Sequence, residues 1–197
     1  MCTRHNQRGI SLIELIMFIV IVSVALAGIL LVMNVTTKNS ADPLVHKQAL
    51  AIAESLLEEV ELMPFTYCEP DDPAAATANS TADCTAPVGG EVLGPETGET
   101  RYSTSTPFDN VNDYGAAISG APGFHMTAAG GIQDINNNTV LTGYDALVTI
   151  TTTALGGIAG TDGSGAPQVL LINVTVTGPD NVPITLEGYR TRYSPKA

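Results

Sequence analysis

The sequence predicts an α+β fold, with a helical N-terminal third followed by a segment rich in antiparallel β-strands. Residues 15–33 are an uninterrupted apolar run of nineteen residues without a charge, long enough as a helix to cross a lipid bilayer. Residues 43–63 carry apolar side chains at mostly three- and four-residue spacing, which is typical of an amphipathic helix. Residues 168–177 show partial alternation of apolar and polar side chains, which is typical of a strand with one buried face.

The overall composition is both apolar and acidic. The chain has 197 residues, of which 44% are hydrophobic, and 20 acidic against 8 basic side chains give a net charge of −12. A phosphate backbone needs a basic protein surface, so this charge argues against nucleic acid as a partner. The hydrophobic content is too high for a disordered acidic tail. A positive mean hydropathy of +0.19 beside a pI near 4.3 indicates two unlike parts, one apolar and one acidic.

The apolar part is the run at 15–33, for which three interpretations compete. A helix of this length spans about 28 Å, close to the ~30 Å hydrocarbon core of a bilayer. Arg4 and Arg8 precede it, so the positive-inside rule leaves the N-terminus in the cytoplasm and the rest of the chain outside. A cleaved secretory signal is one alternative, because residues 25–27 read Ala-Leu-Ala, although the apolar run continues beyond them. A plain signal anchor is another, and neither alternative explains Glu14.

Glu14 lies at the cytoplasmic border of this span and ends a short motif. The motif reads Arg8-Gly9-Ile10-Ser11-Leu12-Ile13-Glu14. A basic leader ending in Gly, then a hydrophobic residue, Ser or Thr, Leu, one further residue and Glu, resembles the N-terminus of the type IV prepilin and pseudopilin family. The resemblance implies that a membrane-embedded prepilin peptidase cuts between Gly9 and Ile10, removes the leader 1–9 and N-methylates Ile10. Glu14 would then be the fifth residue of the mature chain.

The resemblance also implies a role for the N-terminal segment. Cleavage exposes a cationic amine at Ile10, and Glu14 of one subunit can pair with that amine on a neighbour, because either charge alone is costly in an apolar bundle. Residues 10–33 would be a single-pass inner-membrane helix that later enters the core of a filament at the surface of a Gram-negative cell. The implied partners are the prepilin peptidase, other pilin subunits contacted through this helix, and an inner-membrane assembly platform. No cofactor is implied.

A periplasmic amphipathic helix is expected at 34–63, where Pro64 ends the apolar pattern. The resemblance implies one long, gently curved helix from Ile10 to about residue 63, which Pro43 would kink or break locally. Its second half is expected to pack into a globular, β-rich, pilin-like head formed by residues 64–197.

Strands are expected at 100–106, 144–154, 168–177 and 183–193. Residues 178–181 read Gly-Pro-Asp-Asn and mark a hairpin turn between the last two strands. The Gly-rich segment 156–165 lacks a phosphate-binding motif and is interpreted as a hairpin tip. Phe108, Val111 and Tyr114 could share one face of a short helical turn that packs against the sheet.

The two cysteines of the head predict a disulfide. Cys68 and Cys84 are sixteen positions apart and lie in the part expected outside the cytoplasm, where disulfides persist, whereas Cys2 would leave with the leader. A bond closing this loop would stabilise the fold by about 3 kcal/mol in the chain-entropy model. A pair of separate free thiols is the alternative.

One stretch suggests calcium binding. Asp134, Asn136 and Asn138 place oxygen ligands at alternate positions, and Asp145 stands at the twelfth position of an EF-hand-like count. Thr139 replaces the glycine that such a loop needs at its turn, so an Asn-rich turn without metal is the favoured interpretation. No other metal site is predicted.

No catalytic constellation emerges from the sequence. His5, His46 and His125 are scattered, and neither G-x-S-x-G nor H-E-x-x-H occurs. We therefore expect a structural subunit rather than an enzyme.

Three further stretches are similar to a minor-pilin family, the D-type component of the mannose-sensitive haemagglutinin (MSHA) pilus. They are residues 41–60, 108–114 and 170–193. This resemblance implies a minor pilin that takes part in pilus assembly or initiation, and hence in adhesion. A minor pseudopilin of a type II secretion system and a membrane-anchored adhesin that never polymerises are the alternatives.

Overall fold

The computed structural model describes residues 11–85, 89–116 and 122–192. The chain divides into two compact units after Leu44, and helix α1 (Leu12–Leu62) contributes to both. The described part of the first unit is the N-terminal portion of α1. The second unit contains the remainder of α1 and all the strands.

Helix α1 runs without interruption through Pro43, so the expectation of a local break at this residue is wrong. A proline inside a helix removes one backbone donor and crowds one turn, at a cost of about 3 kcal/mol. The hydrogen bonds of the flanking turns remain, and they are sufficient to continue the helix. It ends at Leu62, shortly before Pro64, where the N–H of Met63 donates to the carbonyl of Val60 at 3.2 Å.

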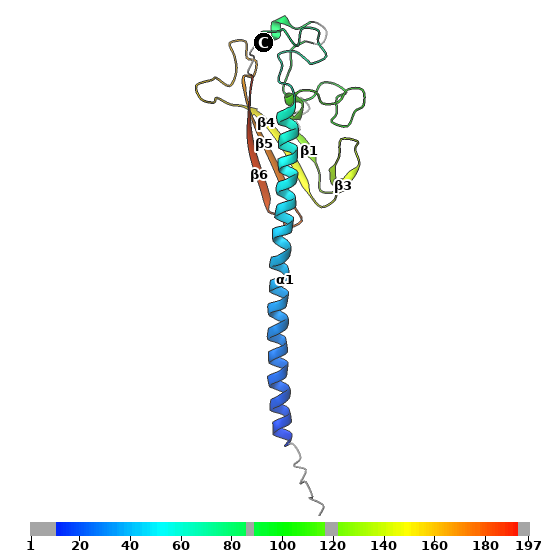
Figure 1. The fold of residues 1–197 in the computed structure, drawn as a ribbon, viewed down its shortest axis with the longest axis vertical. Helices are drawn as coiled ribbons and strands as arrows, with labels where there is room; N and C mark the ends of the chain where they lie inside the picture. Colours follow the sequence, from blue (N-terminus) through cyan, green and yellow to red (C-terminus); the bar gives the residue numbers. More distant parts are fainter. Residues whose placement is uncertain (1–10, 86–88, 117–121, 193–197) are drawn as a thin grey trace, which may run out of the picture. The chain divides into compact units, whose positions relative to one another are not determined.

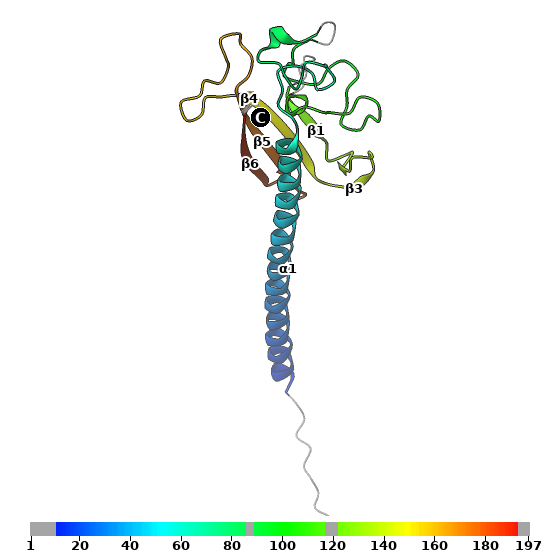
Figure 2. The same ribbon diagram turned by 45° about the horizontal axis from the view of Figure 1, so that its top comes forward.

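The second unit contains a four-stranded antiparallel sheet in the order β1-β4-β5-β6 (Figure 1). Its strands are β1 (Phe124–Met126), β4 (Asp145–Thr152), β5 (Val169–Thr177) and β6 (Pro183–Thr191). A separate hairpin pairs β2 (Ile132–Gln133) with β3 (Thr139–Leu141). Strands β4, β5 and β6 pair in sequence order, while β1 pairs with the other edge of β4. Figure 2 shows the same strands beside the cyan, C-terminal part of α1.

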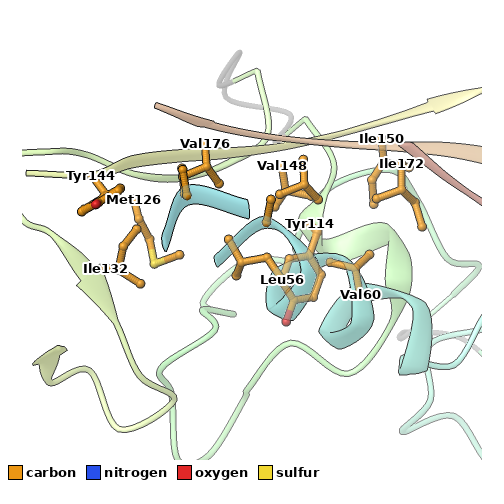
Figure 3. Packing of buried hydrophobic residues seen from close by; sticks show 14 of the residues in the cluster. Leu56, Val60, Tyr114, Met126, Ile132, Tyr144, Val148, Ile150, Ile172 and Val176 are labelled. Carbon is orange, nitrogen blue, oxygen red and sulfur yellow. The ribbon is translucent and has the colours of Figure 1, made fainter. Parts of the chain in front are cut away.

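The hydrophobic core lies between this sheet and residues 45–62 of α1. The fully buried members of the predicted helical stripe are Ala49, Ala53, Leu56 and Val60. The strand register places Val148 opposite Val174 on the buried face of the sheet. Figure 3 shows Leu56 and Val60 of α1 facing Val148 of β4. Burial of each aliphatic side chain contributes about 1.5–3 kcal/mol to the free energy of folding. The predicted α+β arrangement, a helix packed on an antiparallel sheet, is confirmed.

Three of the four predicted strands are present as β4, β5 and β6, whereas the strand predicted at 100–106 is wrong. This segment forms turns in which Ser103 Oγ accepts hydrogen bonds from the backbone N–H groups of Ser105 and Thr106 at 3.3 and 3.0 Å. Serine side chains that bond the local backbone compete with a strand ladder. Strands β1 to β3 are two or three residues long, too short for an alternating pattern to indicate them.

Two 3₁₀ helices, η1 (Thr81–Asp83) and η2 (Val111–Tyr114), lie in the loops between α1 and β1. The helical turn expected from the spacing of Phe108, Val111 and Tyr114 is η2, and its two apolar residues are fully buried. The ring of Phe108 packs edge-on against Tyr114 with centroids 5.0 Å apart. The Gly-rich segment 156–165 connects β4 to β5, as expected of a hairpin tip.

Candidate functional site

The first part of α1, Leu12–Thr36, is long and apolar enough to cross a membrane. Its 25 residues span about 37 Å as a helix, more than the ~30 Å hydrocarbon core of a bilayer. All of these side chains are exposed, so the segment requires lipid or other apolar helices around it. The hydroxyl of Ser23 donates to the carbonyl of Ile19 at 2.7 Å, which satisfies this polar group within the helix.

Glu14 lies in the first turn of α1, where a carboxylate interacts favourably with the helix dipole. The backbone N–H groups of Glu14 and Leu15 donate to the carbonyl of Ser11 at 3.0 and 3.1 Å. Among the ion pairs of the described residues, none includes Glu14. Gly9 and Ile10, the predicted positions of cleavage and methylation, lie outside the described residues.

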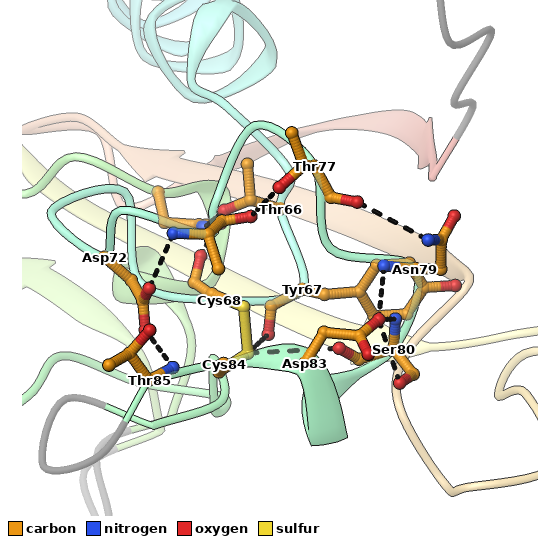
Figure 4. Close-up of a disulfide and its surroundings, with 12 residues drawn as sticks. Thr66, Tyr67, Cys68, Asp72, Thr77, Asn79, Ser80, Asp83, Cys84 and Thr85 are labelled. Atoms are coloured by element: carbon orange, nitrogen blue, oxygen red, sulfur yellow. Dashed lines mark hydrogen bonds between the residues drawn. A yellow bond between two sulfur atoms is a disulfide. The ribbon is translucent and has the colours of Figure 1, made fainter.

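In the head, Cys68 and Cys84 are joined by a disulfide, the pairing expected from the sequence (Figure 4). The carboxylate of Asp72 lies in the same loop and accepts from the backbone N–H groups of Ala74 at 2.7 Å and Thr85 at 2.6 Å. These hydrogen bonds, that of Ala74 first, lower the pKa of Asp72 below its ordinary value. The loop is therefore closed twice, by the covalent bond and by a carboxylate that ties Asp72 to Thr85.

The candidate calcium ligands at 134–138 form the turn between β2 and β3. Asp134 Oδ1 accepts from the backbone N–H groups of Asn136 at 2.9 Å and Asn138 at 2.8 Å. Asp134 Oδ2 accepts from the side-chain amide of Asn138 at 3.1 Å, and the carboxylate of Asp145 contacts His125 instead, at 2.9 Å. The oxygens of Asp134 therefore stabilise an Asn-rich turn, and calcium at this turn stays an untested prediction.

Six carboxylates that no sequence pattern connects lie together elsewhere in the head. We call them the acidic cluster; its members are Glu69, Glu91, Glu96, Glu99, Asp109 and Asp113. In each of three overlapping groups of three, carboxylate oxygens lie within 4.8 Å of one another. The groups are Glu69–Glu91–Glu96, Glu69–Glu99–Asp109 and Glu96–Glu99–Asp113.

Three chain segments meet to form the acidic cluster. The first carries Glu69, the second is 91–99, and the third is 109–113. An isolated antiparallel bridge pairs Cys68 with Gly90, and the N–H of Glu91 donates to the carbonyl of Tyr67 at 2.9 Å, so the segment that carries Glu69 is attached to the segment that carries Glu91. The N–H of Gly94 donates to the carbonyl of Asn112 at 2.9 Å and so attaches the second segment to η2. The disulfide, this bridge and η2 together determine where the six side chains meet.

Three members of the acidic cluster, Glu69, Glu91 and Asp113, are buried, and the other three are half-buried. Glu91 is 5% exposed and Asp113 is 1% exposed. Burial first, and then the neighbouring carboxylates, raise the pKa of Glu91 to about 10. Burial and the hydrogen bond with Glu99 raise the pKa of Glu96 to about 9. Burial also raises the pKa of Asp109 and of Asp113 to about 7, although backbone N–H groups act to lower that of Asp113.

Glu59 of α1 is a half-buried carboxylate with a different environment. Arg101 donates from Nε to Oε1 at 2.6 Å and from Nη2 to Oε2 at 2.7 Å, a bidentate ion pair. The hydroxyl of Tyr114 donates to the same Oε1 at 2.6 Å. Burial acts to raise the pKa of Glu59, but the hydrogen bonds from Arg101 and Tyr114 outweigh it, so this pKa lies below its ordinary value.

The amino-acid sequence also matches a known motif at its N-terminus. Residues 4–30 match the prokaryotic N-terminal methylation motif. This motif is typical of the type IV prepilin and pseudopilin family, and the matched range contains Gly9, Ile10 and Glu14. It implies processing by a prepilin peptidase. No curated protein and no solved structure matches the chain.

The prepilin-like N-terminus could thus be recognised from local sequence, whereas the acidic cluster could not. Its six residues are spread from position 69 to position 113, and no helical or strand period relates them. The available signal was compositional: this part of the chain is rich in acidic residues, and Arg101 is its one basic side chain.

Proposed function

We propose that this prepilin-like chain is a minor pilin of a type IV, MSHA-like pilus that contributes to pilus assembly or initiation and hence to adhesion. The observation that carries the proposal is the combination of a methylation motif, an exposed apolar helix and a pilin-like α+β head in one chain. A structural, non-enzymatic role agrees with this motif.

In this proposal the peptidase removes residues 1–9, and the new amine at Ile10 is methylated. The chain is held in the inner membrane by residues 10–33, with residues 34–63 continuing as the periplasmic helix and residues 64–197 as the periplasmic head. The exposed apolar side chains of Leu12–Thr36 exchange lipid for the helices of other subunits when the filament forms. Glu14 then pairs with the amine of a neighbouring subunit and sets the register between them.

The assignment within the family is the finer part of the proposal. The similarity of residues 41–60, 108–114 and 170–193 to the D-type MSHA minor pilin supports it. The alternatives are a minor pseudopilin of a type II secretion system and an anchored adhesin that never polymerises. A location among pilus genes, rather than among genes of a secretion system, favours the pilus.

The test follows the chain into filaments sheared from the surface of its own host. The wild-type chain is expected in these filaments, and mass spectrometry is expected to find methylated Ile10 as its first residue. Gly9→Ala should leave the leader attached and the chain in the membrane. Glu14→Ala should be cleaved but absent from filaments, whereas the control Glu54→Ala, at an exposed position of α1, should enter them normally.

The outcomes separate the candidate functions. If both motif variants enter filaments like the wild type, the assembly role is wrong. If the wild-type chain is cleaved but stays in the membrane while filaments form, it is an anchored module rather than a pilin.

A further inference from the structure

The acidic cluster lacks the partners that buried carboxylates need. Both carboxylate oxygens of Glu91 are buried and receive no hydrogen bond from an N–H or hydroxyl group among the described residues; the hydrogen bond between Glu91 and Glu69 needs a proton on one of the two acids. Oδ1 of Asp113 is also buried and receives no hydrogen bond among the described residues, whereas its Oδ2 accepts from the N–H groups of Asp109 and Asn110 at 2.9 and 2.8 Å. Leaving a buried charged oxygen unpaired is costly, so these atoms indicate a missing ligand.

Neither Arg101 nor Arg192 forms an ion pair with the acidic cluster among the described residues, although Nη1 of Arg192 is buried without a hydrogen-bond partner there and the charge of Arg192 interacts favourably with Glu91. Arg101 donates from Nε and Nη2 to the carboxylate of Glu59 and from Nη1 to the backbone carbonyl of Gln133 at 3.1 Å. The guanidinium of Arg192 lies 4.2 Å from the ring centre of Phe65 and 4.0 Å from that of Tyr67, and its Nε donates to the carbonyl of Pro167 at 2.9 Å. No salt bridge among the described residues involves a member of the acidic cluster. The negative charge must therefore be reduced by protons or balanced by a bound cation.

The donor atoms select the type of cation. All three groups consist of carboxylate oxygens, without His or Cys, which suits hard cations such as Ca²⁺ and Mg²⁺ rather than Zn²⁺ or Cu²⁺. Two oxygens bound to one Ca²⁺ at roughly 2.3–2.6 Å can lie up to about 5 Å apart, and the carboxylate oxygens of each group lie within 4.8 Å of one another. Mg²⁺ demands a smaller, near-octahedral shell and retains water, so a site made of many carboxylates favours Ca²⁺.

We propose that the acidic cluster is a calcium-binding site, with Glu69, Glu91 and Glu96 as its first ligands. These three are chosen because both oxygens of Glu91 and Oε2 of Glu96 are buried and receive no N–H or hydroxyl donor among the described residues. The bound ion joins the disulfide loop to the segment at 89–99, and Asp113 connects the same cluster to η2. Calcium therefore stabilises the part of the head that has the least regular secondary structure, whether or not the chain forms filaments.

The experiment uses the full chain in detergent, oxidised and freed of metal with a chelator that is then removed. Calorimetric titration with CaCl₂ at pH 7.5 should give saturable binding, with Kd in the range of about 10⁻⁶–10⁻³ M. Saturating CaCl₂ should raise the Tm by about 5 °C or more. An equal concentration of MgCl₂ should raise it by less than half as much. No binding heat and no Tm shift up to about 10 mM CaCl₂ would overturn the proposal.

Matched variants locate the site. Glu91→Gln retains the shape of the side chain, removes one charge, and should weaken calcium binding at least tenfold. Glu187→Gln, at an exposed position of β6, should bind like the wild type, and so should Asp134→Asn in the β2–β3 turn. If Asp134→Asn abolishes binding and Glu91→Gln does not, the ion belongs to that turn and the proposal is wrong. If Glu91→Gln does not fold, Glu96→Gln serves as the second variant, with the same expected loss.

Discussion

Glu59 and Glu91 are two carboxylates of the second compact unit that have opposite environments. Glu59 receives a bidentate Arg101 and the hydroxyl of Tyr114, and its pKa lies below the ordinary value. Glu91 receives no N–H or hydroxyl hydrogen bond from the part of the chain that the structure describes, lies among other acids, and its pKa is raised to about 10. The comparison shows that burial alone does not decide the charge of a carboxylate; the decisive factor is whether the fold supplies a cation.

Replacing Arg101, the cation that pairs with Glu59, should have the largest effect on the stability of the fold. Arg101→Met leaves the half-buried carboxylate of Glu59 without a cation and is expected to lower the free energy of unfolding by about 3–5 kcal/mol. Denaturant unfolding of the full chain in detergent measures this. In the double variant Glu59→Gln/Arg101→Met no charge is left unpaired, so much of the stability should return. A double variant as unstable as Arg101→Met would mean that packing of Arg101, not charge, explains the loss.

Removing the disulfide should have the next largest effect on stability, because the bond positions Glu69, one member of the acidic cluster. Replacing both Cys68 and Cys84 with Ser should destabilise the head by about 3 kcal/mol, since a loop of this length regains its freedom in the unfolded state. The same variant should bind calcium more weakly, because Glu69 follows Cys68 directly. Unchanged calcium affinity in a folded Cys variant would show that the bridge between Cys68 and Gly90 is enough to hold Glu69.

The metal-free head should respond to pH in a direction set by the acidic cluster. The folded-state pKa of Glu91 is about 10, above its unfolded value, so the folded state holds a proton that the unfolded chain releases. This stabilising contribution is complete below the unfolded pKa and is lost as the pH rises towards 10. In chelator, the Tm should fall between about pH 6 and pH 9, and Glu91→Gln should reduce this fall.

Glu59 should affect the stability at acid pH rather than at alkaline pH. Its pKa is lowered on folding, so its contribution is present above the unfolded pKa and is lost as the pH falls through the folded value. Calcium should remove most of the loss on the alkaline side and leave the acid side unchanged. An alkaline loss of Tm that persists in saturating CaCl₂ would contradict the assignment of that loss to the cluster.

The smallest loss of stability is expected when Tyr114, the neutral hydrogen-bond partner of Glu59, is replaced. Tyr114→Phe removes one hydrogen bond to a charged oxygen and retains the buried ring, so the free energy of unfolding should fall by about 1.5–3 kcal/mol. Tyr102→Phe is a control, because its hydroxyl bonds the neutral Gln133 instead, at 2.9 Å. Equal losses in the two variants would mean that the charge of Glu59 adds nothing to this hydrogen bond.

Local patterns predicted most of the framework, and contacts distant in sequence explain the rest. The stripe on α1 and the alternation on β5 are periodic, so they could be read from neighbouring residues. Arg101 lies in a segment with strand-like composition, but its position is determined by Glu59, 42 residues earlier. The acidic cluster depends on a disulfide, one isolated bridge and a 3₁₀ helix, and no local pattern encodes their meeting.

Strand β6 is an edge strand of the sheet, so the backbone N–H and C=O groups on its outer side have no strand partner among the described residues. An open edge of nine residues invites pairing with another chain. β6 begins with Pro183, which lacks an N–H, and carries the charged side chains of Glu187 and Arg190. These residues discourage one head from adding its sheet to the next, a protection that matters most where many copies of the head stand close together.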